Sequence, residues 1–305
     1  NILRLCRDET QREGVLAADG HHVLTGLLHA GLHAGQGCKT AEHAVGALMW
    51  LSHHVPASQL PIVQAGAVAP IVALLRTAPT ASNENVLANA AIVMQNLALT
   101  TAGIEACQKA GAIATLVSLL SAAPTVADEA AGALWNLSYD PEAKKPVNRA
   151  EIREAGAIPP LVALLHGTTA SAAAGALRNL ASDAAGAAAI RSACGIVPLV
   201  ALLHAAEAET AEDAAVALDN MAVRDKQSRP AILTALAARP PPPPPHDGRP
   251  DLATLLKRLQ PTATERLATA EAGDDAAALQ QAVDQATAVR VADAELQRAR
   301  TKLAT

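Results

Sequence analysis

The sequence predicts an all-α protein in which short helices stack as repeats into a solenoid. Three observations predict this: an apolar motif that recurs about every 38 to 47 residues, a second motif that alternates with it, and a near absence of aromatic residues. Half of the 305 residues are hydrophobic, yet the chain has two Trp, one Tyr and no Phe. Short, closely packed helices bury many small side chains, whereas a compact globule usually builds its core around aromatic rings.

The first motif is an Ala-Gly pair followed by a helix rich in Leu and Val. It reads AGAVAPIVALL from Ala65, AGAIATLVSLL from Ala110, AGAIPPLVALL from Ala155 and ACGIVPLVALL from Ala193, with a weaker copy from Ala18. A short first helix is expected to end here, with a glycine in the left-handed or tight backbone of the turn: Gly66, Gly111, Gly156 and Gly195. Prolines in the first turn of the second helix are compatible with a helix start, because a missing backbone N–H costs little there.

The second motif closes a third helix and carries an asparagine. It reads VMQNLAL (93–99), ALWNLSY (133–139), ALRNLAS (176–182) and ALDNMAV (217–223), and ALMWLSH (47–53) has Trp50 in the asparagine position. The third helices are expected to begin at cap-like polar residues that are followed by acids: Thr40, Asn83, Thr125 and Thr210. Each repeat thus contains three helices in roughly 42 residues.

Three segments are expected along the chain. Residues 1–238 form the repeat domain of about five repeats, the first of them truncated, and the start at Asn1 suggests a piece of a longer protein. Residues 239–250 are a proline-rich linker, for which a stiff polyproline spacer and a ligand for an SH3, WW or profilin-like domain both stay open. Residues 251–305 form a helical tail, whose apolar stripe from Leu279 to Leu303 could pair with another helix.

Composition narrows the function classes. The net charge of −5 gives no basic footprint for nucleic acid. No apolar run reaches the about 20 residues of a membrane-spanning helix. Four scattered cysteines without CxxC pairs suit a reducing compartment. We therefore expect no nucleic-acid partner, no membrane span and a cytoplasmic location, with the nucleus and the cytoskeleton as open variants.

Two stretches resemble a known family. EAGAIPPLVALL (154–165) and AAGALWNLS (130–138) are similar to the core motifs of armadillo repeats in β-catenin, plakophilins, importin α and plant and algal armadillo proteins. The similarity covers about residues 1–238 and recurs in register. It implies a right-handed α-solenoid, the armadillo superhelix, whose third helices line a concave groove.

The resemblance also implies a site. In the family the recurring asparagine hydrogen-bonds the backbone of an extended peptide in the groove, and the matching residues here are Asn96, Asn136, Asn179 and Asn220. An amide suits this task because it offers two donors and an acceptor. The alternative is structural, with each amide bonded to backbone in the adjoining repeat, and both roles can hold together.

The residue before each asparagine varies without an obvious rule. The position holds Met49 (before Trp50), Gln95, Trp135, Arg178 and Asp219. A buried position would not accept these in turn, so we expect it to be exposed at the groove edge. Trp135, Trp50 and Arg178 then join the candidate peptide-binding residues, since exposed Trp often marks binding. The alternative is that Trp135 packs along a neighbouring helix.

Two further features bear on the partner. Four residues before the asparagines stand Ile92, Gly132, Gly175 and Val216, so the tryptophan array of importin α is missing. The third-helix segments contain seven acids and two bases, which mildly favours a basic peptide. However, stabilisation of acids by the helix dipole in first turns is the stronger explanation of this excess.

Neither a metal site nor an active site is expected. Seven of the ten histidines precede residue 55, and His29 and His33 are i, i+4 neighbours, but no CxxC or HExxH motif supports zinc. No catalytic motif or cofactor motif is present. We expect a non-enzymatic scaffold or adaptor that binds an extended protein or peptide partner. A nuclear-import adaptor of importin-α type and the substrate-binding part of a larger enzyme, such as a U-box ubiquitin ligase, remain as rivals.

Overall fold

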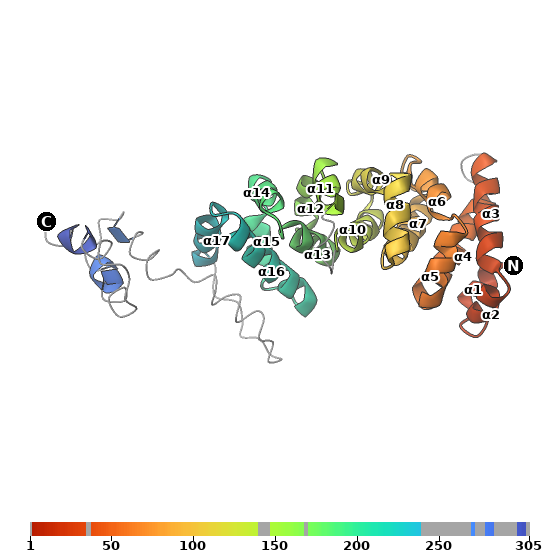
Figure 1. The fold of residues 1–305 in the computed structure, drawn as a ribbon, viewed down its shortest axis with the longest axis horizontal. Coiled ribbons are helices and arrows are strands. Elements are labelled where there is room, and N and C mark those ends of the chain that lie inside the picture. Colours follow the sequence, from red (N-terminus) through yellow and green to blue (C-terminus); the bar gives the residue numbers. More distant parts are fainter. Residues whose placement is uncertain are drawn as a thin grey trace. The chain divides into compact units, whose positions relative to one another are not determined.

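The computed structural model describes residues 2–34, 38–139, 147–167 and 170–238, with the short segments 270–271, 278–283 and 298–302. The chain divides into two compact units, 1–232 and 233–305. Every regular element in the described part is helical, and most of them belong to the first unit (Figure 1). This confirms the all-α prediction.

The described residues of the first unit form five three-helix repeats. The first helices are α2 (Arg12–Ala17), α5 (Gln59–Gln64, after the 3-10 turn η1, Pro56–Ser58), α8 (Thr101–Ala110), α11 (Val147–Glu154) and α14 (Ala184–Ser192). The second helices are α3 (Gly20–His33), α6 (Val68–Leu75), α9 (Ala112–Leu119), α12 (Ile158–Leu164) and α15 (Ile196–Leu202). The third helices are α4 (Lys39–His54), α7 (Glu84–Leu97), α10 (Pro124–Ser138), α13 (Ala170–Leu180) and α16 (Ala208–Arg224).

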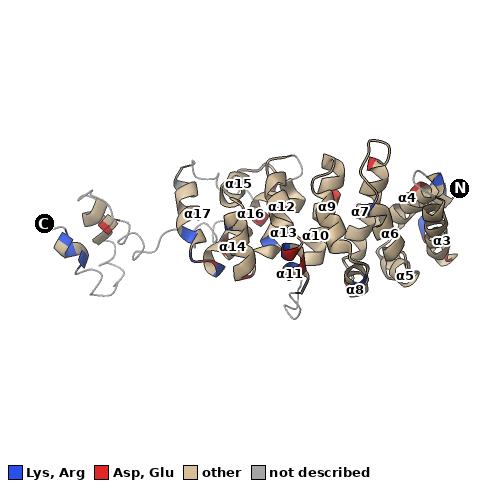
Figure 2. Ribbon diagram, turned by 90° about the horizontal axis from the view of Figure 1, so that it is seen from above, with Lys and Arg blue, Asp and Glu red and all other residues tan. Residues whose placement is uncertain are grey.

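The third helices form one continuous layer. Each packs against the third helix of the next repeat, from α4 through α7, α10 and α13 to α16, and Figure 2 shows the repeats following one another in this order. Helix α1 (Ile2–Arg7) packs against α4 in the place of a preceding third helix. Helix α17 (Ser228–Ala237) follows α16. We call the layer formed by α4, α7, α10, α13 and α16 the third-helix face.

Small residues let the helices approach closely, which explains a core without Phe. Helix α10 buries Ala127, Ala130, Ala131 and Ala133 together with Leu134, all at most 1% exposed. Between α3 and α4, a Cβ placed on Gly31 would lie 2.7 Å from the Cβ of Ala41, so no larger residue fits there. Alanine also has the highest helix propensity, so the same residues favour the helices that they pack.

The predicted turn glycines are present in three of four repeats. Gly66, Gly111 and Gly156 have positive φ angles of 78°, 65° and 81°. The prediction for Gly195 is wrong, because Cys194 takes the left-handed conformation with φ 60° and Gly195 follows it with φ −71°. Gly195 is small for a different reason: a Cβ on it would lie 2.7 Å from Cγ2 of Ile190.

The predicted caps of the third helices are mostly wrong. Only Asn83 stands at an N-cap, that of α7, and its Oδ1 accepts from the backbone N of Thr80 at 2.7 Å instead of capping the helix. The other helices begin earlier than expected, with Thr40, Thr125 and Thr210 inside them. Side-chain caps occur on two first helices: Thr100 accepts from Gly103 N in α8 and Asp183 from Gly186 N in α14.

Two expected segments lie largely outside the described residues. The proline-rich linker 239–250 is one of them. Of the tail 251–305, residues 278–283 and 298–302 are helical, and Leu279, Val283 and Ala299 of the apolar stripe are buried. The domain boundaries and the tail stripe therefore stay predictions.

Among the described residues, no single helix is long and apolar enough to cross a membrane. Two bent pairs, Pro56–Gln64 with Val68–Leu75 and Ala184–Ser192 with Ile196–Leu202, meet the requirements of length and composition only when each pair is taken together.

Candidate functional site

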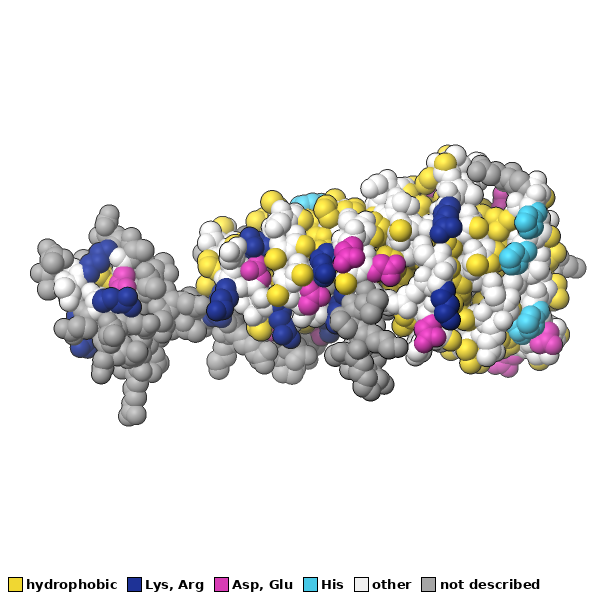
Figure 3. All heavy atoms as spheres, turned by 45° about the horizontal axis from the view of Figure 1, so that its top comes forward, with side chains coloured by type: hydrophobic (Ala, Val, Ile, Leu, Met, Phe, Trp, Pro, Cys, Tyr) yellow, Lys and Arg dark blue, Asp and Glu magenta, His cyan; other side chains and the backbone are white. Residues whose placement is uncertain are grey.

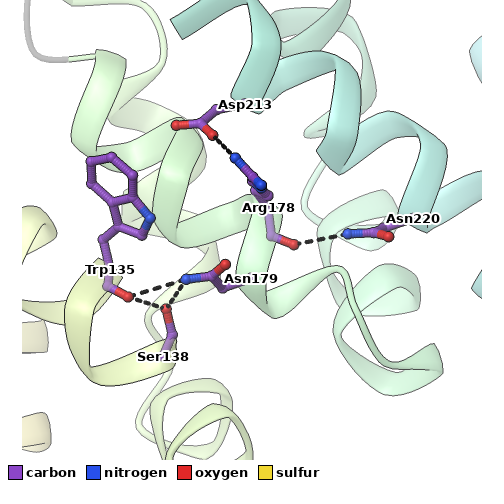
Figure 4. Close-up of polar contacts among 6 residues, drawn as sticks. All are labelled: Trp135, Ser138, Arg178, Asn179, Asp213 and Asn220. Carbon is purple, nitrogen blue, oxygen red and sulfur yellow. Dashed lines mark hydrogen bonds and ion pairs between the residues drawn. The ribbon is translucent and has the colours of Figure 1, made fainter. Parts of the chain in front are cut away.

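The asparagines stand in a row on the third-helix face, and their amides join successive repeats. The Nδ2 of Asn136 donates to the carbonyl of Gln95 at 2.8 Å, and that of Asn220 donates to the carbonyl of Arg178 at 3.2 Å. The Nδ2 of Asn179 donates to the carbonyl of Trp135 at 3.2 Å (Figure 4). Each accepting carbonyl belongs to the residue just before the asparagine position of the preceding repeat.

The acceptors explain why an amide is needed at this position. Gln95, Trp135 and Arg178 lie in the last four residues of α7, α10 and α13, whose carbonyls have no N–H partner within the helix. An amide from the next repeat satisfies one such carbonyl in each case. The asparagines therefore have the structural role, in which each amide bonds to the backbone of the adjoining repeat. Each such bond stabilises the interface between two repeats by about 1 kcal/mol.

Asn179 also donates to the hydroxyl of Ser138 at 3.1 Å (Figure 4), and Asn96 contacts the preceding repeat through a serine alone. The Nδ2 of Asn96 donates to the hydroxyl of Ser52 at 3.2 Å, and this hydroxyl donates in turn to the carbonyl of Met49 at 3.1 Å. The serine thus connects the amide to the carbonyl that the other repeats contact directly. Asn96 is 8% exposed and the most enclosed of the four asparagines.

The other three asparagines keep one acceptor unused. Within the described residues no hydrogen bond reaches the Oδ1 of Asn136, Asn179 or Asn220, and all three side chains are half-buried. In Figure 4 the Oδ1 atoms of Asn179 and Asn220 point away from the carbonyls that their Nδ2 atoms contact. The third-helix face therefore presents a row of acceptors, one in each repeat from α10 to α16.

The position before each asparagine is half-buried, so the prediction of an exposed edge position is wrong. Three of its side chains, those of Gln95, Trp135 and Arg178, reach the third helix of the next repeat. Gln95 covers Gly132, on which a Cβ would lie 2.7 Å from the Nε2 of Gln95. Trp135 covers Gly175 in the same way, with 2.4 Å from such a Cβ to Cε2 of the ring.

Arg178 completes this pattern with a charge pair. Its Nη1 lies 2.7 Å from the Oδ1 of Asp213 on α16, and the Asp213 side chain is 1% exposed (Figure 4). At these three places the side chain matches its partner on the next helix, which is a glycine for Gln95 and Trp135 and an aspartate for Arg178. Gly132 and Gly175 were visible in the sequence, but their spacing alone did not show what covers them.

Trp50 is also engaged within its own repeat. Its ring stacks on His54 with 5.0 Å between centroids and 13° between planes, and the guanidinium carbon of Arg12 lies 5.4 Å from the ring centroid. Burial, followed by the nearby Arg12, lowers the pKa of His54. The ring of Trp50 thus already has two partners within the protein. Its predicted role as an anchor for a peptide stays a prediction.

Two of the predicted acids lie in the first turns of their helices, Glu42 in α4 and Glu84 in α7, but the predicted acids of α10 and α16 do not. Helix α10 has no acid in its first turn, and α16 has only Glu209 there, because both helices begin earlier than expected. Asp128 and Glu129 lie in the second turn of α10, and burial raises the pKa of both carboxyls. The helix dipole acts mainly within the first turn, so it does not account for these two acids.

Histidines gather over the N-terminal helices (Figure 3), where His22, His29 and His33 of α3 are exposed. In the described part of the chain, no three residues among His, Cys, Asp and Glu come close enough together to hold a metal ion.

Comparison with known proteins identifies the repeats. The family model described as Armadillo/beta-catenin-like repeat matches residues 100–139 and 145–182, which contain α8–α10 and α11–α13. Among curated proteins no match was found. Many solved structures match, and those named in the next paragraph are three of the most similar.

An engineered protein is 26% identical over 100% of this chain and 73% of its own, with a TM-score of 0.71. A designed armadillo repeat protein in complex with the peptide (KR)4 is 26% identical over 72% of this chain and 90% of its own, with a TM-score of 0.59. Computationally designed armadillo repeat proteins for modular peptide recognition share the fold at 21% identity, over 91% and 98% of the two chains, with a TM-score of 0.60. The three-helix repeats, the asparagine row and these matches identify residues 100–139 and 145–182 as armadillo repeats in a chain with the armadillo repeat fold, and the subfamily is unresolved.

Proposed function

We propose that the chain is a non-enzymatic scaffold or adaptor of the cytoplasm that binds an extended segment of a partner protein across the third-helix face. One observation carries this proposal: the asparagine amides are oriented by bonds between repeats while their Oδ1 acceptors stay unbonded among the described residues. A peptide bound there would donate backbone N–H groups to these acceptors. Because the contact is to the backbone, it does not depend on the side chains of the partner.

The spacing of the asparagines along the third-helix face suits an extended peptide. Neighbouring helices pack with about 8 to 10 Å between their axes, and an extended peptide rises about 3.3 Å per residue. Asparagines of successive repeats therefore meet backbone N–H groups that are two or three residues apart in the peptide. The varied residues before the asparagines lie beside this path and would supply the selectivity that the backbone contacts lack.

The comparisons support the same reading. A designed armadillo repeat protein at 26% identity was solved in complex with the peptide (KR)4. An importin-α-type adaptor fits less well, because that subfamily has a tryptophan one turn before the asparagine. In this chain the position holds Gly132 and Gly175, where even a Cβ would collide with the side chain from the preceding repeat.

Hydrogen exchange with a bound peptide tests the proposal. Ligands are selected from a displayed library of random peptides, and exchange of the full chain is measured with and without a selected peptide. We expect slower exchange in α7, α10, α13 and α16, and no change with a scrambled peptide of the same composition. Protection confined to first helices such as α8 and α14 would place binding elsewhere and remove the proposal.

A further inference from the structure

The first turn of α3 contains a histidine that is buried with an unused ring nitrogen. His21 is 6% exposed, whereas His22, His29 and His33 of the same helix are exposed. The Nδ1 of His21 is buried and has no hydrogen-bond partner among the described residues. A neutral ring can leave this nitrogen as an unused acceptor, but in a protonated ring it becomes a charged N–H donor without an acceptor. Burying such a donor costs much more than burying the neutral ring.

Three features of the fold disfavour a positive charge on His21. Burial is the largest, and it lowers the pKa of the ring below its ordinary value of 6.5. His22 is the second, because its ring centroid lies 4.5 Å away and its own positive charge would repel that of His21. The start of α3 is the third, since the N–H groups of a first turn disfavour a cation. Asp19 acts in the opposite direction and raises the pKa in part.

The helices packed against α3 do not supply a counter-charge to His21. These helices are α2, α4, α5 and α6. Helices α5 and α6 contain no titratable residue. Helices α2 and α4 contain several, none of which shifts the pKa of His21: Arg12, Glu13, Lys39, Glu42, His43, His53 and His54. Among the described residues, Asp19 is therefore the acid that acts on this ring.

The junction between α2 and α3 leaves no room for the ring to adjust in place. Gly20, next to His21, lies so close to α2 that a Cβ on it would be 2.4 Å from Cγ1 of Val15. Asp19 precedes it in the left-handed conformation, is exposed and makes no side-chain cap on α3. A protonated ring would gain water and the carboxylate of Asp19 by turning outward, and the tight junction has to open for that movement.

Helix α2 in turn holds α1 at the N-terminal end of the repeats (Figure 1). Arg12 of α2 is 9% exposed, and its Nε donates to the carbonyl of Cys6 at 2.8 Å and its Nη2 to the carbonyl of Arg7 at 3.1 Å. These carbonyls end α1, which packs against α4. Loosening the junction between α2 and α3 would therefore loosen α1 as well, and uncover the side of α4 that α1 covers.

We infer that His21 is a pH-sensitive switch, which keeps α1 and α2 packed while its ring is neutral and releases them when the ring takes up a proton. The sign follows from linkage: a histidine whose pKa is lower in the folded than in the unfolded chain stabilises the fold at neutral pH. This stability is lost as pH falls below about 6.5, and the loss levels off below the folded pKa. The switch does not depend on peptide binding at the third-helix face.

Hydrogen exchange of the full chain at about pH 7.5 and about pH 5.5 tests this inference, after correction for the intrinsic effect of pH on exchange. We expect the protection of amides in α1, α2 and the start of α3 to fall severalfold at the lower pH. Protection in α9 and α12, which lie in the central repeats, should change much less. An equal loss in α9 and α12 would mean that acid weakens the whole fold, and this would overturn the inference.

Matched variants assign the effect to one histidine. His21→Phe keeps a buried ring that cannot take up a proton, so protection in α1 and α2 should no longer depend on pH. His29→Gln removes an exposed histidine of the same helix and should leave the pH dependence unchanged. His54→Gln should leave it unchanged too, although His54 stacks on Trp50 beside Arg12. A pH dependence that persists in His21→Phe, or that disappears in His54→Gln, would overturn the inference.

Titration of the histidine rings by NMR in the unaltered chain decides the question even if His21→Phe fails to fold. The signal of His21 is assigned by its absence in His21→Gln. We expect the pKa of His21 to lie below 6.5, with the signals of α1 and α2 changing over the same pH range. A pKa of His21 at or above 6.5, or signals of α1 and α2 that do not follow its titration, would contradict the switch.

Discussion

Replacing Gly186 by alanine is expected to lower the free energy of unfolding by roughly 3 kcal/mol. Gly186 is the third residue of α14, where its N–H donates to the capping Asp183 at 2.7 Å. A Cβ at this position would lie 1.8 Å from the carbonyl oxygen of Leu180 at the end of α13. Because the obstacle is backbone, the junction between two repeats has to open to admit a methyl group.

Urea unfolding followed by circular dichroism checks this expectation, with Gly26→Ala as the matched control. Gly26 lies within α3, and a Cβ there would meet nothing within 4 Å. The same substitution should therefore raise the free energy of unfolding by up to about 1 kcal/mol, through helix propensity. If both substitutions changed the free energy of unfolding by the same sign and size, the close contact between Gly186 and the carbonyl of Leu180 would be contradicted.

Replacing Arg178 by methionine is expected to cost on the order of 3 kcal/mol at neutral pH. Arg178 is the ion-pair partner of Asp213, whose side chain is 1% exposed and whose Oδ2 already lacks a hydrogen-bond partner. Without Arg178 the carboxylate would be buried with no counter-charge. Methionine keeps much of the side-chain volume, so the loss reports the charge rather than a cavity.

The sign of the pH dependence follows from the pKa of Asp213. Burial raises this pKa above its ordinary value of 3.8, while Arg178 lowers it in part, so removing Arg178 raises it further. A carboxyl whose folded pKa exceeds its unfolded pKa destabilises the fold when ionised, and this penalty fades as pH falls through the folded pKa. The loss should thus be large at pH 7 and shrink towards pH 4.

The double variant with Asp213→Asn completes this test. Removing both charges should restore most of the stability at pH 7, because no unpaired charge then remains buried. Stability is followed by urea unfolding at both pH values. A loss that is independent of pH and not rescued by Asp213→Asn would show that the arginine acts through packing alone.

The repeats could be predicted from the sequence because they depend on patterns that recur. Ala-Gly pairs, Leu-rich second helices and one asparagine per repeat are each visible several times, which separates them from chance. The first residue of each third helix was not predictable in the same way. Thr125 looks like a cap, but Pro124 is an equally good first residue, and the helix begins there.

The site was predictable only in part. The row of asparagines follows from spacing, whereas the direction of each amide depends on the carbonyls at the end of the preceding third helix. The burial of Trp135 depends on Gly175, which is 40 residues away in the sequence. A single sequence shows both residues but does not show that they touch, because contact between repeats depends on how the solenoid stacks.

Peptide binding by the variant with Asn136, Asn179 and Asn220 all replaced by alanine tests the central claim most directly. Asn148→Ala is the control, because the Nδ2 of Asn148 also joins two helices, donating to the carbonyl of Leu137 at 2.8 Å, yet it lies on α11 away from the third-helix face. Melting and affinity for a selected peptide are measured for both variants, with affinity taken well below the melting temperature. We expect both variants to melt earlier, and only the triple variant to lose affinity, by tenfold or more. If the triple variant melts earlier but binds the peptide as well as the unaltered chain, the asparagines serve only to join the repeats and the proposed binding face is wrong.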